Sequence, residues 1–250
     1  MFLKKFIMVL VFAIIASVTF ANDVSQSVKD RFSKLLPDMV IKNVTASPIP
    51  GFYQVQVDSG KIFYMSKDGN YLMQGYLFQL NDKQPKNLTL EAEEKFVANL
   101  INNLDKSKMV IYPAENDKPL AHITIFTDTS CPVCHKLHQG IPELVKAGVE
   151  VRYLAFPREG FASSGFEQLQ KVWCADDKID AMNQFMRQIP VKSAKKCDNP
   201  VIEQYVLGQK IGIRGTPAII LENGHIIPGY IPISELIKDS LTTSANNSIR

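Results

Sequence analysis

Apolar residues near the start of the chain recur at the spacing of an amphipathic helix. Between residues 24 and 36 they fall on one face, at Val28, Phe32, Leu35 and Leu36. Pro37 follows and ends the pattern, because proline cannot continue a helix. The pattern predicts one helix whose marked side chains face a core.

Four apolar stretches after this helix predict strands. They are Val40–Ala46, Phe52–Asp58, Lys61–Ser66 and Tyr71–Leu80. Ser59-Gly60 and Lys67–Asn70 are strong turn signals between the later stretches. We therefore expect residues 22–83 to form a small α+β domain, with an antiparallel meander behind one helix.

The segment from Tyr71 to Phe78 is the most apolar of these strands. A small sheet leaves a long edge exposed, and an uncovered apolar edge tends to pair with a second copy of itself. This favours a dimerisation module. Ordinary packing of the strand onto the rest of the chain is the alternative.

A connector is predicted next, over residues 84–105. The chain is polar from Asn81 to Asn87 and contains Pro85, and Thr89 then caps a helix that runs to about Leu104. Acidic residues occupy its first turns, where negative charge suits the helix dipole. Such a helix would hold two modules about 24 Å apart.

Residues 106–250 show the alternation of an α/β domain. Strands are predicted at Met109–Tyr112, His122–Thr127, Val149–Ala155, Ala218–Leu221 and His225–Ile227. A helix between the second and third of them implies parallel pairing. Residues 165–208 form a helical insertion, and a last helix is expected over residues 234–241.

The first 21 residues have the pattern of an export signal. Lys4 and Lys5 precede an apolar run, and small residues surround a cut before Asn22. An uncleaved anchor is the alternative. Cleavage would leave 26 basic residues against 25 acidic ones, so charge gives no argument for nucleic-acid binding.

Candidate chemistry centres on two cysteines three positions apart. Asp128–Ser130 favours a turn and a helix N-cap, and Cys131 stands where a helix would begin. Unpaired N–H groups and the helix dipole there stabilise an anion, which would place the thiol pKa at roughly 3.5–7.5. Cys131 is the candidate nucleophile, and Cys134 can resolve its mixed disulfides.

A lowered pKa improves the Cys131 sulfur as a leaving group more than as a nucleophile. If the pKa fell from about 8.5 to about 5, the thiolate fraction at pH 7 would rise roughly 30-fold, and a Brønsted slope of ~0.45 would remove a similar factor from nucleophilicity. The sulfur of lower pKa, however, leaves a mixed disulfide faster. Repeated attachment and release suits an enzyme that shuffles the disulfides of other proteins.

The same residues admit other interpretations. Cys131 to His135 fits the C-x-x-C-H pattern of covalent haem attachment, but no second axial ligand is evident. Zinc would need two more ligands at close spacing. An inert structural disulfide is disfavoured, because a C-x-x-C disulfide closes a tight ring. His135 itself could tune the thiolate or only cover the surface.

Four cysteines in an exported chain are consistent with two disulfides. With one pair assigned to the redox motif, Cys174 and Cys197 are left to bond with each other. This bond would close a loop of roughly 24 residues and contribute about 3–4 kcal/mol on the chain-entropy model. A structural disulfide is favoured, and a second redox pair is the alternative.

Gly215-Thr216-Pro217 before a strand, together with the Cys-x-x-Cys motif, is the pattern of the thioredoxin fold, in which a cis bond precedes the proline. Further motifs make the resemblance more specific. They are Phe126-Thr127-Asp128, Cys134–His138, Val151–Arg158, Trp173-Cys174-Ala175 and Pro228-Gly229-Tyr230. Together they resemble the DsbC/DsbG family of bacterial periplasmic disulfide isomerases.

This resemblance implies a V-shaped homodimer with cystatin-like N-terminal domains and thioredoxin-like arms that face an apolar cleft. The segment through Gly75 and Tyr76 resembles the dimerisation strand of the family. The resemblance implies a periplasmic protein that acts on misoxidised exported proteins, has additional chaperone activity, and uses no metal or cofactor. An inner-membrane reductase of the DsbD type would keep it reduced.

The resemblance also assigns roles to residues. Cys131 would attack wrong disulfides and Cys134 would release stalled ones, while Thr216 and Pro217 would bind extended client backbone. The second cysteine pair matches the structural disulfide of the family. Pro132-Val133 departs from the Gly-Tyr that is more frequent there, and this dipeptide tunes the reduction potential over about 150 mV. A thiol oxidase and a mainly non-enzymatic holdase therefore stay open as alternatives.

Overall fold

The computed structural model describes residues 25–80, 84–115, 118–189, 191 and 196–248. The predicted signal peptide lies outside these residues. The chain divides into two compact units, Met1–Glu93 and Glu94–Arg250. None of the helices in the described ranges is both long and apolar enough to span a membrane.

The first unit contains a helix over residues 25–35 and a four-stranded antiparallel sheet, as predicted. The strands are β1 (Ile41–Ala46), β2 (Phe52–Val57), β3 (Ile62–Ser66) and β4 (Leu72–Met73), in that order. Val28 and Phe32 pack against Val55 and Phe63. Leu35, expected on the same face, is 52% exposed, so this part of the helix prediction is wrong.

The strand predicted over residues 71–80 is interrupted. Only β4 pairs with β3, and a separate strand β5 (Phe78–Gln79) pairs with β6 (Lys86–Asn87). Gly75 lies between β4 and β5. Glycine weakens a strand because it has no side chain that can pack against its neighbours. The end of the predicted polar linker is therefore part of a second, two-stranded sheet.

Helix α2 (Leu88–Asn102) begins two residues earlier than predicted and has a different cap. Asn87 Oδ1 accepts a hydrogen bond from the Leu90 N–H at 3.0 Å, which is the geometry of an N-cap. Thr89 is buried instead, with its hydroxyl 2.6 Å from the Tyr64 hydroxyl. The second half of α2 contributes to the core of the second unit.

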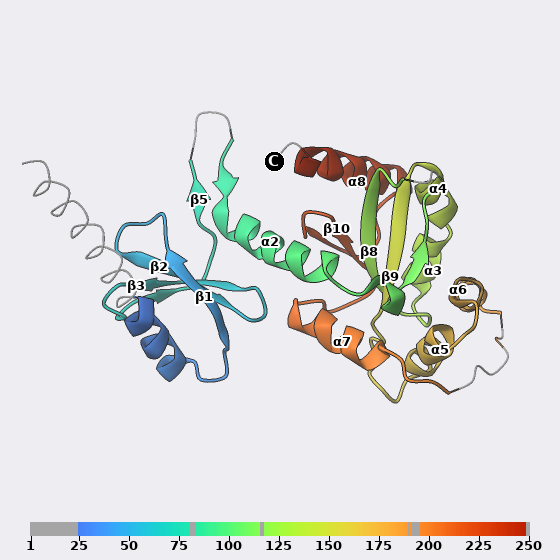
Figure 1. Ribbon diagram of the computed structural model, residues 1–250, viewed down its shortest axis with the longest axis horizontal. Helices are drawn as coiled ribbons and strands as arrows, with labels where there is room; N and C mark the ends of the chain where they lie inside the picture. The colour runs from blue at the N-terminus through green and yellow to red at the C-terminus, as the bar shows by residue number, and fades with distance from the viewer. Residues whose placement is uncertain (1–24, 81–83, 116–117, 190, 192–195, 249–250) are drawn as a thin grey trace, which may run out of the picture. The chain divides into compact units, whose positions relative to one another are not determined.

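The second unit contains a five-stranded sheet in the order β11-β10-β8-β9-β7 (Figure 1). Its strands are β7 (Val110–Tyr112), β8 (Ala121–Thr127), β9 (Val149–Ala155), β10 (Ala218–Leu221) and β11 (Ile226–Pro228). The predicted parallel pairing is confirmed, because β8 and β9 run parallel from Ala121↔Val149 to Thr127↔Ala155. All other pairs in this sheet are antiparallel.

Two apolar cores cover the two faces of this sheet. Ile123 and Ile125 face the core shared with α3 (Pro132–His138), α4 (Ile141–Lys146) and α8 (Ile233–Ser248). Phe126 faces the opposite core, which contains residues of α2. The predicted helical insertion consists of α5 (Ser164–Trp173), α6 (Lys178–Met186) and α7 (Val201–Lys210).

Candidate redox site

The two cysteines lie directly after β8. The Cys131 N–H donates to the Asp128 carbonyl at 3.0 Å, which closes a turn between strand and helix. Cys131 itself is the N-cap of α3, with extended backbone angles, and Pro132 occupies the first helical position. Proline suits this position because its missing N–H would have had no partner in the helix. The predicted helix start next to Cys131 is confirmed.

Asp128 organises this turn through a buried carboxylate. Oδ1 accepts from the Ser130 N–H and hydroxyl at 2.9 and 2.7 Å. Oδ2 accepts from the backbone N–H and Nε of Arg158 at 2.9 and 3.2 Å. A Cβ at Gly165 would overlap Oδ1, so the start of α5 packs directly on the turn. The carboxylate, 1% exposed, is fully paired as a buried charge requires.

Cys131 and Cys134 are free thiols with opposite tendencies to ionise. The pKa of Cys131 is lowered to about 5, chiefly by a hydrogen bond from the Cys134 thiol, with further contributions from the Thr216 hydroxyl, the Cys134 N–H and the Arg158 charge. Burial raises the pKa of Cys134 above its ordinary value. The first sulfur is therefore the thiolate at neutral pH, and the second keeps its proton.

The loop before β10 lies against the first sulfur. The Thr216-Pro217 peptide bond is cis, and Cys131 Sγ is 3.3 Å from the Thr216 carbonyl oxygen. Thr216 Oγ1 is buried and has no hydrogen-bond partner of ordinary geometry among the described residues. The structure thus brings Thr216 and Pro217 to the cysteines from more than eighty residues away in the sequence.

His135 braces the turn with both ring nitrogens. Nε2 is 2.6 Å from the Thr129 carbonyl oxygen, which can only accept, so this nitrogen carries the proton. Nδ1 then accepts from the Gln188 side-chain amide at 3.3 Å. Gln188 has a φ of 59°, the only positive φ at a non-glycine position in the described residues. The ring therefore links the end of α6 to the turn that carries Cys131.

The remaining predicted site residues lie apart from the thiols. Cys174 and Cys197 form a disulfide with an S–S distance of 2.06 Å. Gly75 and Tyr76 lie in the first unit, and Tyr76 is 67% exposed. No group of three or more His, Cys, Asp or Glu side chains able to hold a metal ion occurs in the described ranges.

Asp128 was expected only in the turn before the redox helix, and Arg158 had no predicted role in the site. A signal for them was present, because each follows one of two strands predicted to be parallel. The carboxyl ends of parallel strands meet at one edge of a sheet, where sites are usually built. The redox motif marks this same edge, since it begins at the end of β8.

Comparison with known proteins agrees with this geometry. Residues 19–90 match the family model of the disulfide bond isomerase N-terminal domain, and residues 106–239 match a thioredoxin-like domain. The predicted two-part fold class is confirmed by these matches in order along the chain. Each half of the chain therefore has its own family counterpart.

Proteins from several bacteria resemble the chain over most of its length. The thiol:disulfide interchange protein DsbC of Salmonella typhimurium is 36% identical over 91% of this chain and 91% of its own length. DsbC of Pasteurella multocida is 34% identical over 95% and 99%. A disulfide interchange protein from Neisseria gonorrhoeae has a solved structure that covers 55% of this chain and 99% of its own, with 29% identity and a TM-score of 0.49. On the strength of the nearly full-length sequence relatives, the chain belongs to the DsbC family.

Proposed function

We propose that the chain is a protein disulfide isomerase that reduces and reshuffles incorrect disulfides in exported proteins. The observation that carries this proposal is the Cys131 sulfur, which has a pKa of about 5 and a protonated Cys134 thiol one helical turn away. A thiolate can attack, and a thiolate of low pKa leaves readily.

The exchange balances without any other reagent. The Cys131 thiolate attacks one sulfur of a client disulfide, a Cys131–client bond forms, and the other client sulfur leaves as a thiolate with the electron pair. A client thiolate then attacks the client sulfur bonded to Cys131, in a new pairing, and releases the Cys131 thiolate. The client has changed its pairing with no net oxidation.

A stalled client leaves by reduction. Cys134 loses its proton and attacks the Cys131 sulfur, which forms the Cys131–Cys134 disulfide and expels the client as a thiolate. The client has gained two electrons and the enzyme has lost them. A thiol donor must restore the pair, and an inner-membrane reductase of the DsbD type fits this role.

The loop at Thr216 and Pro217 binds client backbone in this proposal. It lies against Cys131, with the Thr216 carbonyl oxygen 3.3 Å from Sγ, so an extended client backbone bonded to that sulfur would run beside this loop. His135 acts on the thiolate through the turn that it braces, by its contacts with Thr129 and Gln188. Cys174–Cys197 is the structural disulfide of the domain.

The first unit is assigned to dimerisation. Large apolar side chains lie exposed in and around β4 and β5, at Tyr71, Tyr76, Phe78 and Leu80. An exposed apolar patch of this kind marks an interaction surface. A second copy, joined through the segment at Gly75 and Tyr76, would cover them. Residues 1–21 act as a cleaved signal that delivers the protein to the periplasm.

A thiol oxidase of the same fold is the second candidate. It is favoured by the same low pKa of Cys131, because a stabilised thiolate favours the reduced enzyme and makes its disulfide a stronger oxidant. Trapping the protein from cells with a thiol alkylator separates the two functions. An isomerase should be trapped mainly with both thiols free, and an oxidase mainly as the Cys131–Cys134 disulfide.

Refolding of a scrambled multi-disulfide protein tests the activity itself. The wild-type chain should accelerate the recovery of native pairing, and Cys131→Ala should abolish the acceleration. An unchanged rate in Cys131→Ala would exclude the isomerase. Suppression of aggregation at an equal level by both proteins would leave the holdase function.

A further inference from the structure

A cavity of about 520 Å³ opens between α3, α4 and α6 of the second unit. Ile141 and Val145 line one wall, and Ile179 and Met186 line the other. The volume is within the range of ligand sites, roughly 300–1,000 Å³. Neither cysteine of the redox pair lines this cavity, so it is a separate feature beside the site.

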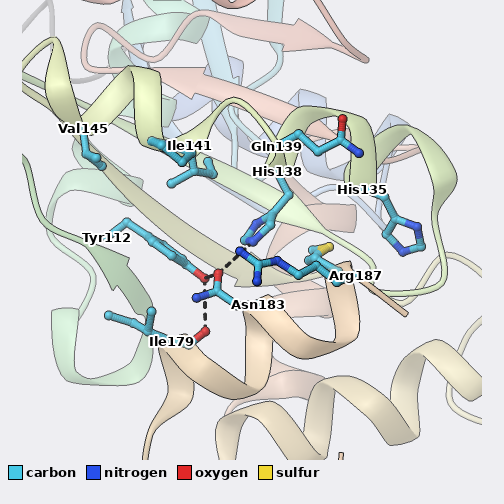
Figure 2. Close-up of a pocket in the computed structure, with 11 residues that line it drawn as sticks. Tyr112, His135, His138, Gln139, Ile141, Val145, Ile179, Asn183 and Arg187 are labelled. Carbon is cyan, nitrogen blue, oxygen red and sulfur yellow. Dashed lines mark hydrogen bonds between the residues drawn. The ribbon is translucent and has the colours of Figure 1, made fainter. Parts of the chain in front are cut away.

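The two ends of the cavity differ in polarity. Figure 2 shows Ile141, Val145 and Ile179 toward one end, and His135 and Arg187 at the other. His135 directly follows Cys134 along α3, so the polar end is the one next to the redox pair. A ligand that entered from the redox site would meet polar groups first and apolar walls beyond them.

The polar groups in the cavity wall already have partners. The Tyr112 hydroxyl donates to Asn183 Oδ1 at 2.9 Å (Figure 2), and His138 Nε2 donates to the same oxygen at 2.9 Å. His138 Nδ1 accepts from the Tyr153 hydroxyl at 3.0 Å. Burial lowers the pKa of His138 to about 4, so its ring is neutral at pH 7. Satisfied polar groups offer little to a polar ligand, which favours an apolar occupant.

The cavity lies within reach of a client that is bonded to Cys131. His138 is seven residues beyond Cys131 along the chain. A helix rises ~1.5 Å per residue, so the two positions are separated by about 10 Å. An extended client covers ~3.3 Å per residue, so a side chain about three residues from the client cysteine can reach the cavity.

We propose that this cavity is a client subsite, which accepts an apolar and preferably aromatic side chain about three residues from the client cysteine held by Cys131. Arg187 is exposed and forms no ion pair in the described part of the chain, so its guanidinium is available to a client carbonyl or carboxylate at the polar end. This inference rests on the proposed function, because it needs the Cys131 mixed disulfide.

Photo-crosslinking within that mixed disulfide tests the position of the client. The full chain with Cys134→Ala is treated with a nine-residue peptide whose central cysteine is bonded to 2-nitro-5-thiobenzoate. The Cys131 thiolate attacks the peptide sulfur, the peptide–Cys131 bond forms, and thionitrobenzoate leaves with the electron pair. Benzoylphenylalanine stands three residues from the cysteine, on either side, and mass spectrometry locates the crosslink.

Crosslinks to Ile179, Met186 or Ile141 are expected. Crosslinks confined to residues outside the cavity would overturn the subsite, although Cys131 had reacted as proposed. Failure of the peptide to bond to Cys131 would overturn the proposed function and the subsite with it. The two failures are therefore distinguishable in one experiment.

A filled cavity gives a second test. Ile179→Trp should raise KM about tenfold or more for reduction of a phenylalanine-containing disulfide peptide by glutathione, because burial of an aromatic side chain is lost. KM for the matching alanine peptide, and the pKa of Cys131, should not change. Ile202→Trp on α7 is the matched control, since Ile202 is 49% exposed and does not line the cavity. Equal KM values for the two peptides in wild-type protein would refute the subsite.

Discussion

Asp128 holds Arg158 by two hydrogen bonds to a single carboxylate oxygen, at 2.9 Å from the backbone N–H and 3.2 Å from Nε. The Asp128 carbonyl also accepts from the Cys131 N–H at 3.0 Å. One residue thus holds both the turn of the nucleophile and the cation that lowers its pKa. The guanidinium cannot move away from the thiolate without breaking its ion pair with the buried Asp128 carboxylate.

Arg158→Met should therefore raise the pKa of Cys131. The expected shift is at most about one unit, because the guanidinium is partly exposed and solvent screens its charge. The measurement is the thiolate absorbance at 240 nm as a function of pH. Arg31→Met removes the same charge from the first unit and should leave the curve in place. An identical shift in both variants would show that Arg158 has no specific effect.

The Cys134 thiol is the largest cause of the low pKa of Cys131. Cys134→Ala removes this donor and should raise the pKa of Cys131 by about one unit or more, whereas Cys134→Ser keeps a donor and should shift it less. The pH dependence of Cys131 alkylation reports the value in both variants. If alanine and serine give the same pKa, a hydrogen bond from position 134 does not stabilise the thiolate.

The reduction potential should depend on pH in two regimes. Below the pKa of about 5, reduction of the Cys131–Cys134 disulfide takes up two protons, and above it only one, because Cys131 stays ionised. For a two-electron couple the midpoint reduction potential then changes by about 60 mV per pH unit at low pH and by about 30 mV per pH unit between pH 6 and 8. A change of about 60 mV per pH unit at pH 7 would mean that Cys131 is protonated there.

The stability of the reduced protein depends on pH through the same ionisation of Cys131. The folded pKa of Cys131 is depressed below its unfolded value of about 8.5, so the thiolate stabilises the reduced fold most above that pH and loses its effect as the pH falls through about 5. Cys131→Ser removes the titrating group and serves as the control.

The cysteine pair outside the redox motif closes a loop with a sequence separation of 23. Replacement of Cys174 and Cys197 by alanine should lower the free energy of unfolding by about 3–4 kcal/mol, because the unfolded chain regains loop entropy. Urea denaturation under oxidising conditions measures the change. Loss of isomerase activity with unchanged stability would instead favour a second redox pair.

Much of the second unit could be predicted because the signals were local. The bounds of β9 and β10 agree with their apolar runs, and Pro217 marked the cis turn. The links between Asp128 and Arg158 could not be read directly, since they join residues thirty positions apart through tertiary packing. The only indication in the sequence that Asp128 and Arg158 meet is their position just after β8 and β9.

The first unit was predicted less well because its apolar residues do not all point inward. The apolar run over residues 71–80 predicted one long strand, but only Leu72–Met73 and Phe78–Gln79 are paired. Apolar content does not fix strand pairing when the side chains are exposed. The cap of α2 was missed for a related reason, since Thr89 was taken into a buried hydroxyl pair with Tyr64.

The attachment of α2 to the second unit can be tested with two glycines. Gly212 and Gly224 have φ values of 89° and 88°, in the left-handed region that suits glycine. A Cβ at Gly212 would meet nothing within 4 Å, whereas at Gly224 it would overlap the Glu94 carbonyl and lie 2.6 Å from Ala98 N. Both substitutions cause backbone strain, and only the second also collides with α2.

Gly212→Ala should therefore cost about 1–2 kcal/mol of unfolding free energy, the usual penalty for a left-handed non-glycine residue. Gly224→Ala should cost several kcal/mol, because two backbones must separate and the 2.7 Å hydrogen bond between His225 and Glu94 would be strained with them. Urea denaturation of both variants gives the comparison. Equal losses of unfolding free energy would mean that α2 can move away from Gly224 without destabilising the fold. The second half of α2 would then not be a fixed part of the second unit.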